Sequence, residues 1–392
     1  MADQPKLVIE LFRHGARGPV YTNGEPYWRG KEGKLTDAGK AQHFIAGVKL
    51  MQRYPHLEKI LMQPGKMYLQ TTMSSRTQES LQAHLWGLFF GKLAKIDEFD
   101  IFDPNFYQKF KESQTAKLYF NPEIYEKKAK NFVPTQIHMT PMREEYELLI
   151  TEICPRVRKM LEPSKQKDLE HFMRKIAKMI HAELGIELSP TEIRDFYDLQ
   201  VANLFEGQPI KGNLKPDSEL WKYIKAAGDY YVMSERFGSA KQRNILGVPL
   251  LTKIGNFLEN AKKDTQDYSL VLLSAHEFTL MTFLASLDII HPDCIRNKLE
   301  GNEDRTLCHA PYFASSILIE LWQREGGHQV RMLYDGEPIP FCGKEDGFCD
   351  YDFVKGVFDR ITSRYSMEDV KRKCGRGARK DRVSIENNLL TF

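Results

Sequence analysis

The sequence of 392 residues predicts an α/β fold, with a three-layer α/β/α core, a mixed, mostly parallel sheet and an inserted helical cap. Segments of strand character alternate with segments of helical periodicity in both the first and the last third of the chain, which is typical of βα units. Between them, residues 155–243 show helical patterns and no convincing strand. We therefore expect a core of residues 1–154 and 244–392 and a cap of residues 155–243.

The first part of the core begins with a strand and a helix. The apolar run at 6–12 ends abruptly at Arg13-His14-Gly15, which predicts a strand followed by a loop. A second strand is predicted at 66–72, and it leads through Ser74-Ser75-Arg76 into another helix. Between the two strands, Thr36 can cap a helix. The apolar residues of that helix recur at helical spacing: Ala41, Phe44, Ile45, Val48 and Met51.

The helical cap is predicted from two segments. One amphipathic helix stops at Gly185, and its apolar face comprises Leu169, Phe172, Met173, Ile176, Ile180 and Leu184. The segment 189–192 then has the pattern of a capping box, with Ser189 as the cap and Pro190 at the first helical position. This pattern predicts a second helix that begins at Pro190.

The second part of the core repeats the alternation. Residues 247–260 are predicted to be helical, and the apolar strand 268–275 ends at His276-Glu277. Two further strands are predicted at 315–322 and 329–334.

Composition excludes several classes of protein. Lys and Arg number 56 against 53 Asp and Glu, a net charge of +3, which argues against a nucleic-acid partner. The basic stretch at 371–382 is interpreted as a solvated segment. No run approaches the ~18 apolar residues of a membrane span. None of the six cysteines forms a CxxC pair, so the sequence predicts neither a cysteine metal site nor a thioredoxin-type motif. We expect the protein to act without a metal or a cofactor.

Polar side chains follow three predicted strands at the point where each strand ends, which is where α/β enzymes keep their sites. Arg13, His14 and Arg17 follow the first strand, Arg76 follows the second, and His276-Glu277 follows the strand at 268–275. The planar fork of arginine donates two parallel hydrogen bonds, a geometry that suits phosphate. Each of these groups, taken alone, is also typical of an ordinary surface or helix-capping residue. Their combination indicates a site for a phosphate group.

These residues lie in a series of motifs that resembles the histidine acid phosphatases, the larger branch of the histidine phosphatase superfamily. The resemblance runs from residue 6 to about residue 360. The matching segments, in chain order, are RHGARGP at 13–19, Leu35-Thr36 with Gly39, Gln42-His43 and Gly47, SSRTQES at 74–80, Pro134 with Ile137-His138 and Pro141, Cys154-Pro155-Arg156, GVPLLTKI at 247–254, SAHEFTL at 274–280, APYFASSILIEL at 310–321 and VRMLYDGEPI at 330–339.

The resemblance implies a role for each site residue. His14 is expected to be the nucleophile that accepts the phosphoryl group as phosphohistidine. The phosphate is expected to be surrounded by Arg13, Arg17, Arg76 and His276, with His276 as an imidazolium. Glu277 is expected to protonate the leaving oxygen and then to activate water. Since the family usually has Asp at this position, the extra methylene leaves the geometry at the leaving group, and so the substrate range, open.

The function implied is a phosphomonoesterase, an acid phosphatase acting on a phosphorylated small molecule, lipid or peptide. Two alternatives remain open: phosphoryl transfer of the phosphomutase type, and a non-catalytic phosphate-binding relative. The cap and the loop 21–33 are expected to select the leaving group. In that loop, Tyr27, Trp28 and Arg29 are the expected contacts, while a packing role for Tyr27 and Trp28 stays open.

The resemblance also implies pairings of the six cysteines, Cys154 with Cys374, Cys342 with Cys349 and Cys294 with Cys308. Disulfides favour an oxidising compartment. We therefore expect a secreted or lysosomal protein whose signal peptide is absent from this sequence, while a cytoplasmic location stays open. A homodimer is expected from the family alone.

Overall fold

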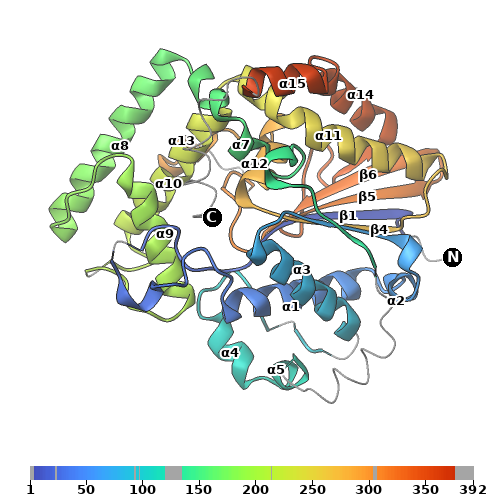
Figure 1. The fold of residues 1–392 in the computed structure, drawn as a ribbon, viewed down its shortest axis with the longest axis horizontal. Helices are drawn as coiled ribbons and strands as arrows, with labels where there is room; N and C mark the ends of the chain where they lie inside the picture. The colour runs from blue at the N-terminus through green and yellow to red at the C-terminus, as the bar shows by residue number, and fades with distance from the viewer. Residues whose placement is uncertain are drawn as a thin grey trace.

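The structure is a computed structural model that describes residues 4–22, 24–91, 94–96, 98–119, 135–212, 214–302 and 307–375. In these residues an eight-stranded mixed sheet lies between two layers of helices, and a further group of helices stands beside the sheet (Figure 1). The predicted α/β fold is confirmed. No helix in the described ranges is long and apolar enough to cross a membrane. Pro134 and residues 376–382 of the basic stretch lie outside the described residues.

The sheet has the strand order β3-β2-β4-β1-β5-β6-β7, with β8 paired to β6. Strands β3, β2, β4 and β1 are parallel, whereas β5 and the strands beyond it pair antiparallel. The predicted strands are all present, and β3, β7 and β8 are additional short ones. The bounds are β1 Leu7–Arg13, β2 Met67–Thr71, β3 Ile137–His138, β4 Leu270–Ala275, β5 Ser316–Arg324, β6 Gly327–Tyr334, β7 Glu337–Pro338 and β8 Phe348–Asp350.

The helices are grouped by the predicted cap region: the first set lies outside it, except for the start of α11, and the second set lies within it. The first set is α1 Asp37–Arg53, α2 Leu57–Leu61, α3 Ser75–Phe90, α4 Phe106–Glu112, α5 Gln114–Tyr119, α7 Ile150–Ile153, α11 Ala240–Lys262, α12 Glu277–Ser286, α13 Pro292–Leu299, α14 Tyr351–Thr362 and α15 Met367–Cys374. The second set is α8 Pro163–Leu184, α9 Glu192–Phe205 and α10 Glu219–Phe237. Short 3-10 turns are Pro26–Trp28, Pro64–Lys66, Met142–Glu144 and Pro155–Met160.

Strand β1 is buried on both faces, which explains its continuous apolar run. Leu7, Ile9 and Leu11 pack in the core cluster that contains α11 and α12. Val8 and Phe12 point the other way, into the cluster with α1 and α3. Successive side chains of a strand alternate between faces, so β1 holds the two helical layers together.

Helices α1 and α3 cross closely because glycines face each other at the crossing. A Cβ on Gly47 would lie 2.0 Å from the His84 carbonyl oxygen, and a Cβ on Gly87 would lie 2.0 Å from that of Phe44. Only glycine fits at these two positions. The crossing fixes the start of α3, and with it Arg76, near the carboxyl end of the sheet.

Two predictions of helix limits need correction. Helix α9 begins at Glu192 with Thr191 as its N-cap, not at Pro190. The Ser189 N–H donates to Glu192 Oε2 at 2.8 Å, so half of the predicted capping box forms, in the turn before the helix. Helix α11 begins at Ala240, ahead of its predicted start at residue 247. Gly185, in the left-handed conformation, ends α8 as predicted, and the Thr36 side chain caps α1.

The structure contains the three disulfides that the resemblance implies: Cys154–Cys374, Cys294–Cys308 and Cys342–Cys349. The first joins the end of α7 to the end of α15, across 220 residues of sequence. Cross-links over such long loops stabilise the folded state mainly by restricting the unfolded chain.

Candidate active site

The register of the sheet brings His14 and His276 together. Strands β1 and β4 are parallel, Arg13 is paired with Ala275, and the His14 N–H donates to the Ala275 carbonyl at 3.0 Å. The residues that follow the two strands therefore stand side by side. The imidazole rings of His14 and His276 are 5.5 Å apart, edge to face.

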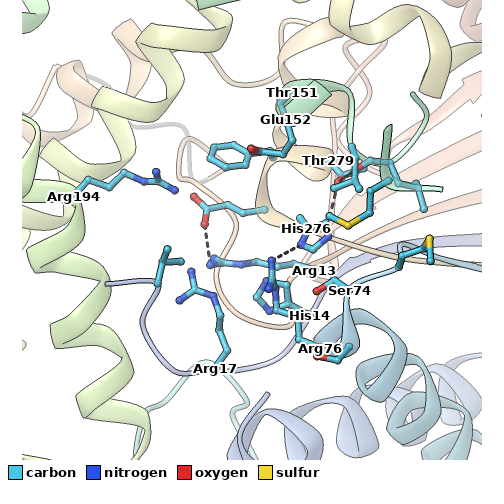
Figure 2. A pocket seen from close by; sticks show the side chains of 18 residues that line it. Arg13, His14, Arg17, Ser74, Arg76, Thr151, Glu152, Arg194, His276 and Thr279 are labelled. Carbon is cyan, nitrogen blue, oxygen red and sulfur yellow. Dashed lines mark hydrogen bonds and ion pairs between the residues drawn. The ribbon is translucent and has the colours of Figure 1, made fainter. Parts of the chain in front are cut away.

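Strand β2 supplies the third side of the site. It runs parallel to β4 with Thr71 opposite Ser274, and α3 begins at Ser75, so Arg76 is its second residue. All six predicted site residues line one cavity of about 230 Å³. Figure 2 shows Arg13, His14, Arg17, Arg76 and His276 gathered around it.

The loop after β1 is held tightly against the start of α1. A Cβ on Gly15 would lie 2.2 Å from the Gly39 carbonyl oxygen, and one on Gly39 would lie 2.2 Å from that of Ala16. The Ala16 N–H donates to Gln42 at 2.7 Å. This close approach fixes the loop backbone, and with it the direction of His14.

The His14 ring is oriented by its own loop. Its Nδ1 lies 2.9 Å from the Gly15 carbonyl oxygen, which can only accept, so Nδ1 carries the proton and Nε2 keeps its lone pair. Burial and the neighbouring Arg76 lower the pKa of His14 well below its ordinary value. The ring is therefore neutral, the form that can act as a nucleophile.

The three arginines differ in their partners. Arg13 donates to the Pro311 carbonyl at 2.6 Å and pairs with Glu277 at 2.8 Å. Arg17 forms a two-point ion pair with Asp198, at 2.9 and 3.0 Å.

Among the described residues, the hydrogen bonds of Arg76 are long, 3.4 Å to the Gly33 carbonyl and 3.4 Å to His276 Nδ1. Burial, with Arg17 and Arg13 nearby, lowers the pKa of Arg76 to about 9. Its guanidinium is buried close to two other positive charges, those of Arg17 and Arg13. An anion in the cavity would relieve that repulsion.

His276 does not have the charge expected from the sequence. Its Nδ1 accepts from Arg76, and its Nε2 lies 3.0 Å from the Thr72 hydroxyl, which places the proton on Nε2. Burial and the arginines Arg76 and Arg13 lower its pKa well below the ordinary value. His276 is thus a neutral ring in the free protein, because it is buried beside arginines and no carboxylate of the described residues forms an ion pair with it.

Glu277 is the first residue of α12 and lies at the rim of the buried group. Its side chain is 21% exposed, compared with 9% for Arg13. The longer Glu side chain reaches Arg13 and still lines the cavity.

The sequence analysis missed Asp198 and Thr72, which orient Arg17 and His276. No local signal could have found Asp198, because it contacts the site only through the packing of α9 on the loop after β1. Tyr27, Trp28 and Arg29, the expected leaving-group contacts, do not line the cavity. Trp28 is buried, and its indole N–H donates to Asn203 of α9 at 2.7 Å, so it docks the loop on the cap helix.

Comparison with known proteins agrees with the family resemblance of the motifs. Residues 6–335 match the model of the histidine phosphatase superfamily (branch 2). Lysosomal acid phosphatase of Homo sapiens is 25% identical over 388 residues, covering 94% of this chain and 80% of that protein. Prostatic acid phosphatase of Rattus norvegicus is 24% identical over 358 residues, covering 86% and 81%. The crystal structure of the phytase from D. castellii is similar in fold, with a TM-score of 0.59 at 15% identity, covering 96% of this chain and 83% of that one.

Proposed function

Because this chain belongs to branch 2 of the histidine phosphatase superfamily, as its motifs predict, we propose that it hydrolyses phosphate monoesters through a phosphohistidine at His14. Membership of the family and the acid phosphatases among its relatives confirm the predicted enzyme class. The roles of the individual residues are part of the proposal.

The observation that carries the proposal is the orientation of His14. Its protonated Nδ1 donates a hydrogen bond to the Gly15 carbonyl, so its unprotonated Nε2 is the nitrogen available to a phosphate. His14 lines the same cavity as the three arginines. In the first step, Nε2 attacks phosphorus, the bond from phosphorus to the ester oxygen breaks, and Glu277 gives that oxygen a proton. In the second step, Glu277 takes a proton from water, the water oxygen bonds to phosphorus, and the bond to Nε2 breaks to release inorganic phosphate.

Charge placement supports the same reaction. Phosphoryl transfer gains most from positive charge held around the transferring oxygens, and Arg13, Arg17 and Arg76 supply it from two sides of the cavity. The phosphate also competes with Glu277 for Arg13. A dianion bound to Arg13 favours the protonated carboxyl of Glu277, which is the form needed to protonate the leaving oxygen.

The disulfides and the relatives support a location outside the cytosol. Three disulfides favour an oxidising compartment. Two of the relatives are a lysosomal and a prostatic acid phosphatase. We propose a secreted or lysosomal protein that acts on a phosphorylated small molecule, lipid or peptide; the homodimer stays a prediction.

The test is hydrolysis of p-nitrophenyl phosphate between pH 4 and 8 in EDTA, by the wild type and by His14→Ala. We expect turnover by the wild type and a loss of at least a thousandfold in the variant. His171→Ala is the matched control, because His171 lies on α8 and does not line the cavity. Equal activity of His14→Ala and the wild type would refute the proposed nucleophile.

A further inference from the structure

One arginine at the cavity is left without an anionic partner. Arg194, on cap helix α9, lines the cavity together with the six site residues. In the described part of the chain it forms no hydrogen bond and no ion pair. Figure 2 shows its side chain extending from the cap toward the centre of the cavity.

Three acids near Arg194 have other partners, and its neighbour in sequence, Asp195, forms no ion pair with it in the described residues. Asp198, one turn along α9, uses both carboxylate oxygens on Arg17 and also accepts from the Val20 N–H. Glu277 pairs with Arg13 at 2.8 Å, and Glu152 pairs with Arg236 at 4.0 Å. The donors of Arg194 are therefore available to a ligand.

An aromatic ring holds Arg194 in place without using those donors. The centre of the Arg194 guanidinium lies 5.4 Å from the centre of the Phe278 ring, and Arg236 lies 4.2 Å from the same ring. A cation near an aromatic face is attracted to it and loses part of its freedom. A guanidinium that is already placed loses less entropy when it binds an anion.

The cavity that Arg194 shares with the proposed phosphate site has a mostly apolar wall. Leu148, Leu149, Met142 and Phe278 line it, and Met73 stands at its exposed edge. A cavity of about 230 Å³ is below the ~300–1,000 Å³ of pockets that hold drug-sized ligands. A short carbon chain fits such a wall better than a polyhydroxylated group.

We propose that Arg194 binds a second anionic group, a carboxylate or a phosphate, at the far end of the leaving group. The preferred substrate is then a phosphate monoester with a short apolar chain that ends in an anion. This inference rests on the proposed function and narrows its substrate class. Both anions match the same planar donors, so the two are separated by experiment.

The experiment compares three substrates of equal chain length: propyl phosphate, 3-phosphooxypropanoate and propane-1,3-diol bisphosphate. The readout is phosphate release, expressed as the ratio of kcat/KM for each anionic substrate to kcat/KM for propyl phosphate. We expect the wild type to prefer at least one anionic substrate about tenfold or more, after correction for the two equivalent ends of the bisphosphate. Whichever ratio is larger identifies the anion.

Three variants locate the effect. Arg194→Gln is expected to bring the ratio close to one, and Arg194→Lys to restore part of it. Arg174→Gln removes the same charge from an exposed position on cap helix α8, with a side chain that is 69% exposed, and is expected to keep the ratio. A ratio near one in the wild type, an unchanged ratio in Arg194→Gln, or an equal fall in Arg174→Gln would overturn the inference.

A binding measurement separates this inference from the proposed reaction. Calorimetric titration of His14→Ala with propane-1,3-diol bisphosphate and with propyl phosphate needs no turnover. If the wild type hydrolyses none of the substrates, the proposed function fails. The inference then stands only if the bisphosphate binds about tenfold more tightly and Arg194→Gln removes that difference.

Discussion

Asp198 on cap helix α9 binds Arg17 of the loop after β1 through both carboxylate oxygens, at 2.9 and 3.0 Å. The same carboxylate accepts from the Val20 N–H at 2.9 Å. Burial alone would raise the pKa of Asp198, but the Arg17 guanidinium holds it below its ordinary value. The loop after β1 is thus oriented by helix α9, and the carboxylate stays ionised.

Asp198→Asn is expected to lower kcat/KM for p-nitrophenyl phosphate on the order of tenfold, because a charge-assisted hydrogen bond contributes ~1.5–3 kcal/mol. Arg17 then loses one of its two hydrogen bonds to residue 198 and keeps its bond to the Gly18 carbonyl, so it adopts more orientations. Steady-state kinetics measure the effect. Asp195→Asn, on the same helix and with no ion pair in the described residues, serves as the control. Equal kcat/KM for both variants and the wild type would contradict this positioning role.

Glu277→Gln is expected to lower kcat for the hydrolysis of alkyl phosphates by about a hundredfold or more, and kcat for p-nitrophenyl phosphate much less. Alkoxide is a poor leaving group and needs the proton, whereas nitrophenolate leaves without it. Glu277→Asp tests the extra methylene: it keeps the acid but shortens its reach to the leaving oxygen. The comparison is kcat for the two substrate classes in each variant. An equal reduction of kcat for both substrate classes would show that Glu277 does not protonate the leaving oxygen.

The pKa of the His14 imidazole is expected to lie below 6.5, and Arg76→Gln is expected to raise it. Burial is the largest cause of the depression and the charge of Arg76 is the next. NMR titration of the ring, assigned by its loss in His14→Ala, measures both values. Arg143→Gln, outside the set of cavity residues, is the control. A His14 pKa that Arg76→Gln leaves unchanged would mean that the arginine does not act on the nucleophile.

His43 is expected to make the protein less stable in acid. Burial and His84 lower its pKa from 6.5 to about 3, and its Nε2–H donates to the Arg13 carbonyl at 2.9 Å. Between pH 6.5 and 3, His43 is protonated in the unfolded chain but neutral in the folded chain. The free energy of unfolding therefore falls as the pH falls through this window.

Urea unfolding at pH 7 and pH 4.5 measures the effect of His43. We expect His43→Gln, which keeps a donor for the carbonyl, to reduce the acid loss of unfolding free energy by about 2 kcal/mol. His181→Gln, near the end of α8, is the control. If His43→Gln lost as much unfolding free energy between pH 7 and pH 4.5 as the wild type, groups other than His43 would cause the pH dependence.

The sequence predicts the parts of the site that the sheet itself arranges. Arg13, His14 and His276 follow strands, and the carboxyl ends of parallel strands meet at one edge, so local pattern was sufficient. Asp198, Thr72 and Arg194 could not be predicted in the same way, since the packing of elements far apart in sequence places them beside Arg17, His276 and Phe278. The neutral state of His276 likewise depends on burial among arginines, which the sequence pattern does not reveal.

The central claim, a covalent phosphohistidine at His14, is tested most directly by rapid quenching. The wild type is mixed with a 32P-labelled phosphate monoester, quenched in alkali within milliseconds, digested and mapped. The account predicts label that survives alkali, is lost in acid and lies on the peptide containing His14, with none in His14→Ala. Turnover by the wild type without such label, or label on another peptide that persists in His14→Ala, would contradict it.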